Sequence, residues 1–420
     1  MSVDPSEWTV SSQTALNVSL AEPERAITFP PKFTYPIFGD AEQIFGYKNL
    51  RIDLAFDCHT LKPMLGYRFS EKLTDGVIDI EETIGALLPP GDWVFKDENK
   101  WLDLIDLEEE SGEFNLPQDK IIYSYPFVDS NTNEKSTFNI YKFNLKDPLA
   151  RKLVKRFEIL VLLYIEAGSY INADDPLWDI YLVYKNSQDE PKPTFVGFTT
   201  CYKHWKYEGA HIHDAKAIEL AKYRGKISQF IILPPFQRQG HGKILYDKII
   251  QSWLLDDKCV EITVEDPSEE FDELRDSCDL RRIIESGILA SLDKLPISNE
   301  WKENTRKSQK MVKRQFDRVL EMSLLWLHLN KNKQGAKEIA AGIIGLNEKN
   351  IRLEIKKRIY LKNKDALDEL QLPDMRDKLQ TTYERVQEDY EDMLEEKTFN
   401  LSSKRSISDE DLGNSKKIKL

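Results

Sequence analysis

Residues 226–266 read as one unit of strand, glycine loop, helix and strand, which restricts the chain to folds that contain a parallel pair of strands. Residues 226–235 form an apolar, β-branched run that ends at two prolines, as expected for a strand buried on both faces. Residues 243–256 place apolar side chains at helical spacing, and residues 261–266 alternate apolar and polar side chains before Pro267. This order predicts a βαβ crossover with its loop at the carboxyl end of the first strand, where open α/β sheets bind ligands.

The loop between this strand and this helix reads Gln-Arg-Gln-Gly-His-Gly at residues 237–242. Gly240 and Gly242 lack a Cβ, so the backbone can turn sharply there and approach a ligand closely. The N–H groups and the positive dipole end of the following helix would make a site for a doubly charged pyrophosphate. Two glycines after a strand also occur in ordinary tight turns, and it is the flanking unit that favours phosphate binding.

Several separated segments carry a family resemblance. The stretch from Ile227 to Asp276, which contains FIILPPFQRQGHGKILYDKIIQSWL and then EITVEDPSEEFDELRD, resembles the type B histone acetyltransferases, a branch of the GNAT superfamily. The likeness extends to FTYPIFGDAEQIFGY at 33–47, IEAGSYINADD at 165–175 and YKHWKY at 202–207. The resemblance implies a mixed α/β fold with a GNAT acetyltransferase domain, acetyl-CoA as co-substrate and lysine acetylation as the reaction.

The same resemblance implies how acetyl-CoA is held. In this superfamily the strand before the loop parts from the next strand, and its backbone pairs with the pantetheine arm. The implied contacts, mostly through the backbone, are Phe230, Ile231 and Ile232 along the arm and Gln237, Arg238, Gln239, Gly240, His241, Gly242 and Lys243 around the pyrophosphate. Side-chain identity is expected to matter least at Arg238, Gln239 and His241. We do not interpret His241 as a catalytic base, because it occupies the variable place in the loop motif.

Acetyl transfer to lysine requires a base, because a lysine with a pKa of about 10.4 is protonated at neutral pH. A carboxylate in a partly apolar site, with its pKa raised towards the working pH, can take the proton directly or through a water. Glu265 closes the strand after the loop helix, and in the family that the chain resembles the first acid of Val-Glu-Asp-Pro is the general base. Asp266 and Glu166 are further candidates. Alternatively, Asp266 only forms a turn before Pro267, and Glu166 is a solvated carboxylate. No cysteine is placed to form an acyl-enzyme, which predicts direct transfer.

The resemblance also implies a groove for the histone H4 tail, lined by Asp40, Ala41, Glu42, Trp205, Lys206 and Tyr207. Aromatic rings can pack a lysine stem or hold its cation over the ring face. Lys206 is an unattractive neighbour for a basic tail unless its charge points to solvent, and a core position is the alternative for Trp205. The implied partners are histone H4, with H3 as H3–H4, and a WD40-repeat histone chaperone.

Charge and composition limit the other function classes. A formal net charge of −13 over 420 residues argues against generic binding to nucleic-acid phosphates. The four cysteines have no CxxC spacing, so we expect neither a zinc site nor a disulfide framework, and His211 with His213 is interpreted as a chance pair. The acidic run at 103–113 is interpreted as a solvated face, and the acidic run at 264–274 as functional.

Targeting signals are weak. The amino terminus lacks a signal-peptide pattern, and no apolar stretch reaches the about 18 residues that cross a bilayer. Short basic runs at 404–405 and 416–419 resemble fragments of a nuclear import signal. We therefore expect the protein in the cytoplasm and the nucleus, and we do not expect it to bind a membrane.

We expect three parts and a tail: an α+β amino-terminal domain for histone or chaperone contacts (1–135), the acetyltransferase domain (136–288), a small helical carboxyl-terminal domain (289–398) and a disordered tail (399–420). A helix is predicted over 149–157, with Asp147 as its cap and Pro148 at its first position. Periodicity leaves the apolar run 159–165 open between helix and strand. The basic stretch 301–364 is interpreted as a helical bundle, and a helix-turn-helix on DNA is the alternative.

Together these features predict an enzyme that moves acetyl from acetyl-CoA to lysines of free, newly made histone H4, in connection with chromatin assembly. One alternative is a GNAT enzyme that acts on protein amino termini or small amines. Another is a histone-binding escort that keeps the fold without catalysis, which Glu265 and the intact glycine loop disfavour.

Overall fold

The computed structural model describes residues 4–22, 25–129, 133–187, 192–207, 209–211 and 222–395. Contacts divide the chain into two compact units, Met1–Asp266 and Pro267–Leu420. The boundaries predicted at 135 and 288 differ from this division and stay predictions, while His213 and the predicted tail lie outside the described residues. Within the described ranges, no helix combines the length and the apolar character that a membrane span requires.

A five-stranded mixed sheet forms the first half of the first unit, in the order β3-β2-β6-β7-β9. Its strands are β2 (Leu16–Ala21), β3 (Ala26–Phe29), β6 (Arg51–Asp57), β7 (Pro63–Arg68) and β9 (Val94–Phe95). The accompanying short elements are η1 (Pro5–Trp8), β1 (Thr9–Ser11), α1 (Ser12–Ala15), α2 (Tyr35–Phe38), β4 (Gln43–Phe45), β5 (Tyr47–Lys48), β8 (Glu71–Lys72), α3 (Ile80–Gly85) and α4 (Glu98–Glu110). The pairs β2–β6 and β7–β9 are parallel, so the chain must cross over between them.

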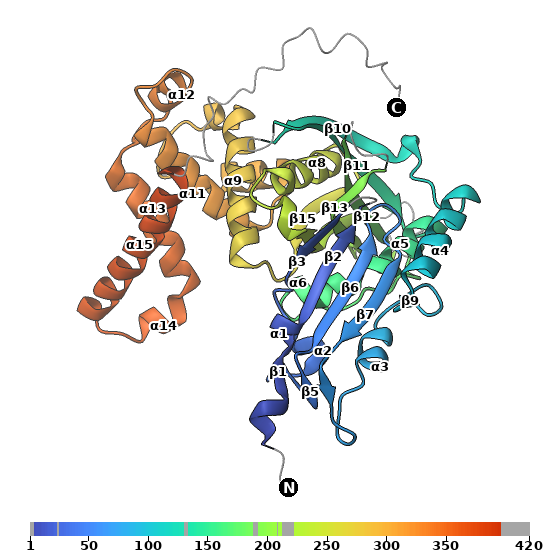
Figure 1. Cartoon of the computed structure of the whole chain (residues 1–420). Helices are drawn as coiled ribbons and strands as arrows, with labels where there is room; N and C mark the ends of the chain where they lie inside the picture. The colour runs from blue at the N-terminus through green and yellow to red at the C-terminus, as the bar shows by residue number, and fades with distance from the viewer. Residues whose placement is uncertain are drawn as a thin grey trace. The chain divides into compact units, whose positions relative to one another are not determined.

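A six-stranded sheet follows, in the order β10-β11-β12-β13-β14-β15 (Figure 1). Its strands are β10 (Ile121–Val128), β11 (Lys135–Asn144), β12 (Trp178–Ser187), β13 (Thr194–Trp205), β14 (Tyr223–Ile232) and β15 (Cys259–Val264). Its helices are η2 (Gln118–Lys120), α5 (Pro148–Phe157), α6 (Ile159–Tyr164), η4 (Pro234–Phe236) and α8 (His241–Leu255). All neighbours are antiparallel except β14 and β15, which pair in parallel through the α8 crossover. The predicted βαβ unit is therefore confirmed.

Local signals explain the two helices between β11 and β12. The carboxylate of Asp147 accepts a hydrogen bond from the N–H of Leu149, and Pro148 is the first residue of α5, as predicted. The apolar run that periodicity left open is the helix α6, and it buries Ile159, Leu160, Val161 and Leu163. Packing against the sheet decides this choice, because a run that is apolar on all sides fits either element.

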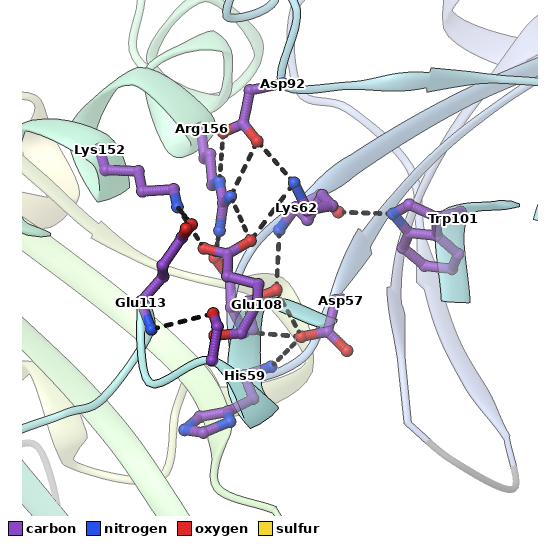
Figure 2. A network of polar contacts seen from close by, with 11 residues as sticks. Asp57, His59, Lys62, Asp92, Trp101, Glu108, Glu113, Lys152 and Arg156 are labelled. Atoms are coloured by element: carbon purple, nitrogen blue, oxygen red, sulfur yellow. Dashed lines mark hydrogen bonds and ion pairs between the residues drawn. The ribbon is translucent and has the colours of Figure 1, made fainter. Parts of the chain in front are cut away.

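A buried charge network joins α5 to α4 and to the loop before β9 (Figure 2). Arg156 is fully buried, and its guanidinium lies 2.6 Å from Asp92 and 2.7 Å from Glu108. Lys62 contacts both carboxylates, and Lys152 contacts Glu108. The prediction of a solvated face for 103–113 is thus wrong for Glu108, because cations distant in sequence neutralise its carboxylate and allow its burial.

The second unit is helical. Its elements are α9 (Glu269–Glu285), η5 (Ile288–Ser291), α10 (Asn299–Ser308), α11 (Lys313–Leu329), α12 (Ala336–Gly342), α13 (Glu348–Lys362), α14 (Lys364–Asp368) and α15 (Leu372–Glu395). The apolar face of α11 is buried in a core shared with α9, α13 and α15, and it includes Phe316, Val319, Leu320, Leu324 and Leu327. Acidic residues of the run 264–274 occupy the first turn of α9, where they face the positive end of the helix dipole. That placement gives this part of the run a structural role.

Candidate active site

The pairing between β14 and β15 ends in the middle of β14. Ile227 and Val264 are the last partners, and the N–H of Glu265 donates to the Ile227 carbonyl at 2.9 Å. β14 runs on to Ile232 in register with β13. The predicted pantetheine contacts, Phe230, Ile231 and Ile232, lie on this continued stretch. The two strands thus part in the way that the family resemblance implies.

A β-bulge marks the point where the strands part. Along β13, Thr200 pairs with Gln229 and Cys201 pairs with Ile227, so Ser228 is an extra residue in β14. A bulge of this kind bends the strand and redirects its side chains. It places the Ser228 hydroxyl within reach of Glu265, the residue that follows β15.

Both oxygens of the Glu265 carboxylate are held by β14. Oε1 lies 2.6 Å from Lys226 Nζ, and Oε2 accepts a hydrogen bond from Ser228 Oγ. Burial acts to raise the pKa of Glu265, but the hydrogen bonds from Lys226 and Ser228 and the charge of Lys226 outweigh it and lower this pKa below its usual value. The expectation of a raised pKa is therefore wrong, because the two β14 side chains stabilise the charged form. Glu265 is ionised at neutral pH, which is the state that can accept a proton.

The other two carboxylate candidates are exposed, as Glu265 is. Asp266 lies in a bend before Pro267 with a positive φ of 32°. Glu166 lies in the turn after α6, where Gly168 is required because a Cβ would come within 2.7 Å of the Val161 carbonyl oxygen.

The turn that carries Glu166 is tied to β14 and to the loop that carries Asp40. The Ser169 carbonyl accepts from Gln229 Nε2 at 2.7 Å, which joins the turn to β14 next to the bulge. The Ala167 N–H donates to the Tyr35 hydroxyl at 2.6 Å, which joins the turn to α2. These two bonds bring together α2, the turn after α6 and the part of β14 where it separates from β15.

Within the loop 34–42, the predicted histone contacts differ in their surroundings. The Glu42 carboxylate accepts from the backbone N–H of Thr34 at 2.7 Å and from that of Tyr35 at 3.1 Å. The first of these bonds is the main cause that lowers the pKa of Glu42. Asp40 and Ala41 are exposed. Glu42 therefore holds its own loop in shape, while Asp40 faces solvent.

The aromatic segment Trp205–Tyr207 lies at the other end of β14. Trp205 pairs with Tyr223, and the four-residue step from Tyr223 to Ile227 corresponds to roughly 13 Å along a strand. The rings of Trp205 and Tyr207 meet edge to face at 5.6 Å, and Tyr207 is 62% exposed. Trp205 is half-buried, and Lys206 is exposed.

The glycine loop is held by its own side chains. Arg238 and Gly240 have positive φ angles of 63° and 92°, and α8 begins directly afterwards with His241, Gly242 and Lys243 in its first turn. Gln237 Nε2 donates to the Ile232 carbonyl at 2.7 Å. A Cβ at Gly240 would meet no atom within 4 Å, so backbone conformation rather than space calls for glycine there.

His241 is buried, with only 1% of its surface exposed. Its Nδ1 lies 2.9 Å from the Tyr125 hydroxyl and its Nε2 lies 3.1 Å from Gln239 Oε1. Gln239 and His241 thus have side-chain partners within the protein, which the expectation that side-chain identity matters least there did not take into account. The partner Tyr125 lies 116 residues earlier, which is why the loop motif alone gave no sign of the contact.

Among the described residues, no group of three or more His, Cys, Asp or Glu side chains could hold a metal ion. The four cysteines are buried thiols. The site brings together the start of α8, where N–H groups favour an anion, the separation of β14 from β15, and the ionised carboxylate of Glu265. This combination suits acyl transfer from a thioester to an amine.

Three family models match the chain. The model described as histone acetyl transferase HAT1 N-terminus matches residues 8–166, that of the acetyltransferase (GNAT) family matches residues 157–271, and that of fungal HAT1, C-terminal, matches residues 276–329.

Curated relatives match the chain along its length. A protein of Kluyveromyces lactis is 42% identical over 424 residues, which cover 100% of both chains. A protein of Candida albicans is 42% identical over 97% of this chain and 95% of its own, and one of Schizosaccharomyces pombe is 34% identical over 88% of each. All three are named histone acetyltransferase type B catalytic subunit.

Proposed function

This chain belongs to the type B histone acetyltransferase catalytic subunits of the GNAT family, and we propose that it acetylates lysine side chains in the amino-terminal tail of free, newly made histone H4. It is an acyltransferase with acetyl-CoA as its co-substrate. The observation that carries the proposal is the position of Glu265, which follows directly on the last pair of β14 and β15.

The residues that would hold acetyl-CoA follow the strand separation. Phe230, Ile231 and Ile232 would pair with the pantetheine arm, because they lie where β14 has left β15. The loop from Gln237 to Lys243 would hold the pyrophosphate at the start of α8, where N–H donors and the helix dipole favour an anion. The bound co-substrate supplies an acetyl group already activated as a thioester.

Glu265 would act as the general base. Its ionised carboxylate takes a proton from the acceptor ammonium, directly or through a water, and the neutral amine then attacks the thioester carbonyl. The amide bond forms as the carbon–sulfur bond breaks, and the hydrogen that the attacking nitrogen loses passes to the sulfur, so that CoA leaves as its thiol. Asp266 lies beside the base, and Glu166 lies in the turn tied to β14, so both would add negative charge that attracts a cationic acceptor.

The histone tail would bind along the loop with Asp40, Ala41 and Glu42 and along Trp205, Lys206 and Tyr207. Asp40 offers an exposed carboxylate, and Tyr207 an exposed ring that can cover a lysine stem. Histone H4 bound to H3, and a WD40-repeat histone chaperone, are the proposed partners. Location in cytoplasm and nucleus stays a prediction from basic runs that lie outside the described residues.

The test is acetyl transfer from labelled acetyl-CoA to an H4 tail peptide, an H3 tail peptide and a small amine. Glu265→Gln should lower kcat on the H4 peptide by about 10² to 10⁴ and leave acetyl-CoA affinity nearly unchanged. Glu261→Gln is the matched control, because Glu261 lies on the same strand and pairs with Arg224 at 3.0 Å before the strands part.

Equal turnover on all three acceptors would move the protein to the GNAT enzymes that act on amino termini or small amines. Unchanged turnover in Glu265→Gln would place the base elsewhere, while a loss of activity in Glu261→Gln as large as in Glu265→Gln would mean that the strand rather than the base had been damaged.

A further inference from the structure

We propose that a directed hydrogen-bond chain from Tyr125 through His241 to Gln239 fixes the shape of the pyrophosphate loop, so that Tyr125 and His241 are positioning residues for acetyl-CoA. The inference rests on the proposed role of residues 237–243 in binding the co-substrate. It assigns a task to Tyr125 at the sheet edge and to His241, which occupies a variable place in the glycine motif.

The direction of every hydrogen bond follows from one backbone carbonyl. The Pro235 carbonyl can only accept, so the amide nitrogen of Gln239 must face it, at 3.1 Å. The Gln239 amide oxygen then faces His241 Nε2 at 3.1 Å, and because this oxygen can only accept, Nε2 carries the hydrogen. In a neutral imidazole Nδ1 is then an acceptor, and the Tyr125 hydroxyl donates to it at 2.9 Å.

The surroundings of His241 favour this neutral tautomer. The Phe138 ring stacks on the imidazole at 4.1 Å and 23°, and the Phe127 ring lies 4.9 Å away. A charged imidazolium is costly in such an apolar enclosure. Burial raises the pKa of Tyr125, so its hydroxyl keeps the hydrogen that it donates.

The chain of bonds anchors the loop at the end where α8 begins. His241 is the first residue of α8, and the two left-handed residues Arg238 and Gly240 precede it. A non-glycine residue such as Arg238 holds a positive φ only where the surroundings impose it. Gln237, bonded to the Ile232 carbonyl, anchors the opposite end of the loop. The loop is thus held at both ends, and its second anchor reaches β10 at the edge of the sheet.

Removing the Tyr125 hydroxyl should therefore act on the loop from a distance. In Tyr125→Phe, Nδ1 of His241 loses its donor inside an apolar enclosure. The imidazole then loses its tie to β10, so Gln239 and the start of α8 are held less firmly. We expect the Kd for acetyl-CoA to rise about tenfold, as one buried polar group loses its partner, with kcat at saturating acetyl-CoA close to wild type.

The experiment measures acetyl-CoA binding by calorimetry and steady-state kinetics on the full chain. Tyr123→Phe is the matched control, because it removes the same atom from the same strand, two residues away, and the Tyr123 hydroxyl has no place in this chain of bonds. His241→Gln is the second variant, since its amide can still donate to Gln239 and should lose less affinity than His241→Leu. Nitrogen NMR of the histidine rings, assigned with His241→Gln, should show hydrogen on Nε2 in the wild type.

The outcomes separate the two proposals. A wild-type protein that does not bind acetyl-CoA would refute the role of the loop and with it the proposed function. Wild-type binding with equal affinities in Tyr125→Phe and Tyr123→Phe would overturn the inference alone, as would an NMR signal with hydrogen on Nδ1. Raised Kd with preserved kcat in Tyr125→Phe, and a smaller rise in His241→Gln than in His241→Leu, would support it.

Discussion

Replacing Arg156 by methionine tests how much the buried charge network contributes to stability. The guanidinium contacts Asp92 through two nitrogens, at 2.6 and 2.9 Å, and Glu108 at 2.7 Å, and it donates to the Thr60 carbonyl at 2.8 Å. Methionine keeps much of the apolar stem and removes all four contacts. Breaking a buried ion pair from one side costs about 3–5 kcal/mol, because the remaining charge stays buried without its partner.

The neighbours of the network place the expected loss at the lower end of this range. Lys62 lies 2.6 Å from Asp92, and Lys152 lies 2.6 Å from Glu108, so each carboxylate keeps at least one cation in Arg156→Met. We therefore expect the free energy of unfolding to fall by about 3 kcal/mol. Arg51→Met is the control, since Arg51 pairs with Asp53 at the surface and such pairs contribute about 0–1 kcal/mol.

The assay is urea denaturation combined with hydrogen exchange, read on peptides from α4 and α5. Peptides from α11 in the second unit serve as an internal reference. Glu108→Gln added to Arg156→Met should recover part of the loss, because a neutral amide needs less charge compensation at this buried position than the carboxylate does. If the free energy of unfolding falls by less than about 1 kcal/mol in Arg156→Met, as in Arg51→Met, the reasoning that burial makes this network important for stability is refuted.

Three further predictions concern the same unit. Lys226→Met should raise the pKa of Glu265 above its wild-type value, because the ammonium 2.6 Å away is a cause of its lowering, and carboxyl NMR titration measures this shift; an unmoved titration would contradict it. Gly168→Ala should destabilise the chain by about 1–3 kcal/mol and lower acetyl transfer, because the new Cβ would lie 2.7 Å from a backbone oxygen, and thermal unfolding with an activity assay checks both. For Asp92 and Glu108, burial acts to raise the pKa, but the bonds and charges of Arg156 and its neighbours outweigh it and lower both values. Ionised Asp92 and Glu108 therefore stabilise the fold at a pH above their unfolded-state pKa values, and this stabilisation is lost as the pH falls through their lower folded-state pKa values. Because Arg156 is a cause of this lowering, acidification should reduce the urea midpoint less in Arg156→Met than in wild type.

The sequence predicted those helices and strands whose formation depends on residues close together in the chain. The Asp147 cap, Pro148 at the start of α5 and the βαβ unit around the glycine loop all depend on residues that are near in sequence. The ambiguity at 159–165 had a physical reason, because a run buried on every side carries no period. Packing against β14 was needed to settle it as α6.

Contacts distant in sequence account for what was missed. The pKa of Glu265 depends on Lys226 and Ser228, 39 and 37 residues earlier, and on a bulge that no periodicity reveals. The burial of His241 depends on Tyr125, and that of Glu108 on Arg156. Both polar residues would be read as exposed from composition alone, since only a specific partner makes burial of such groups tolerable.

The charge network also has a consequence for the order of events during synthesis. Arg156 follows Asp92 by 64 residues and Glu108 by 48. At about 5–20 residues per second, the ribosome adds Arg156 roughly 2 to 10 s after Glu108. During that interval the nascent first sheet carries two carboxylates whose guanidinium partner has yet to be made. The amino-terminal segment should therefore leave the ribosome incompletely packed and reach its final structure only when α5 joins it.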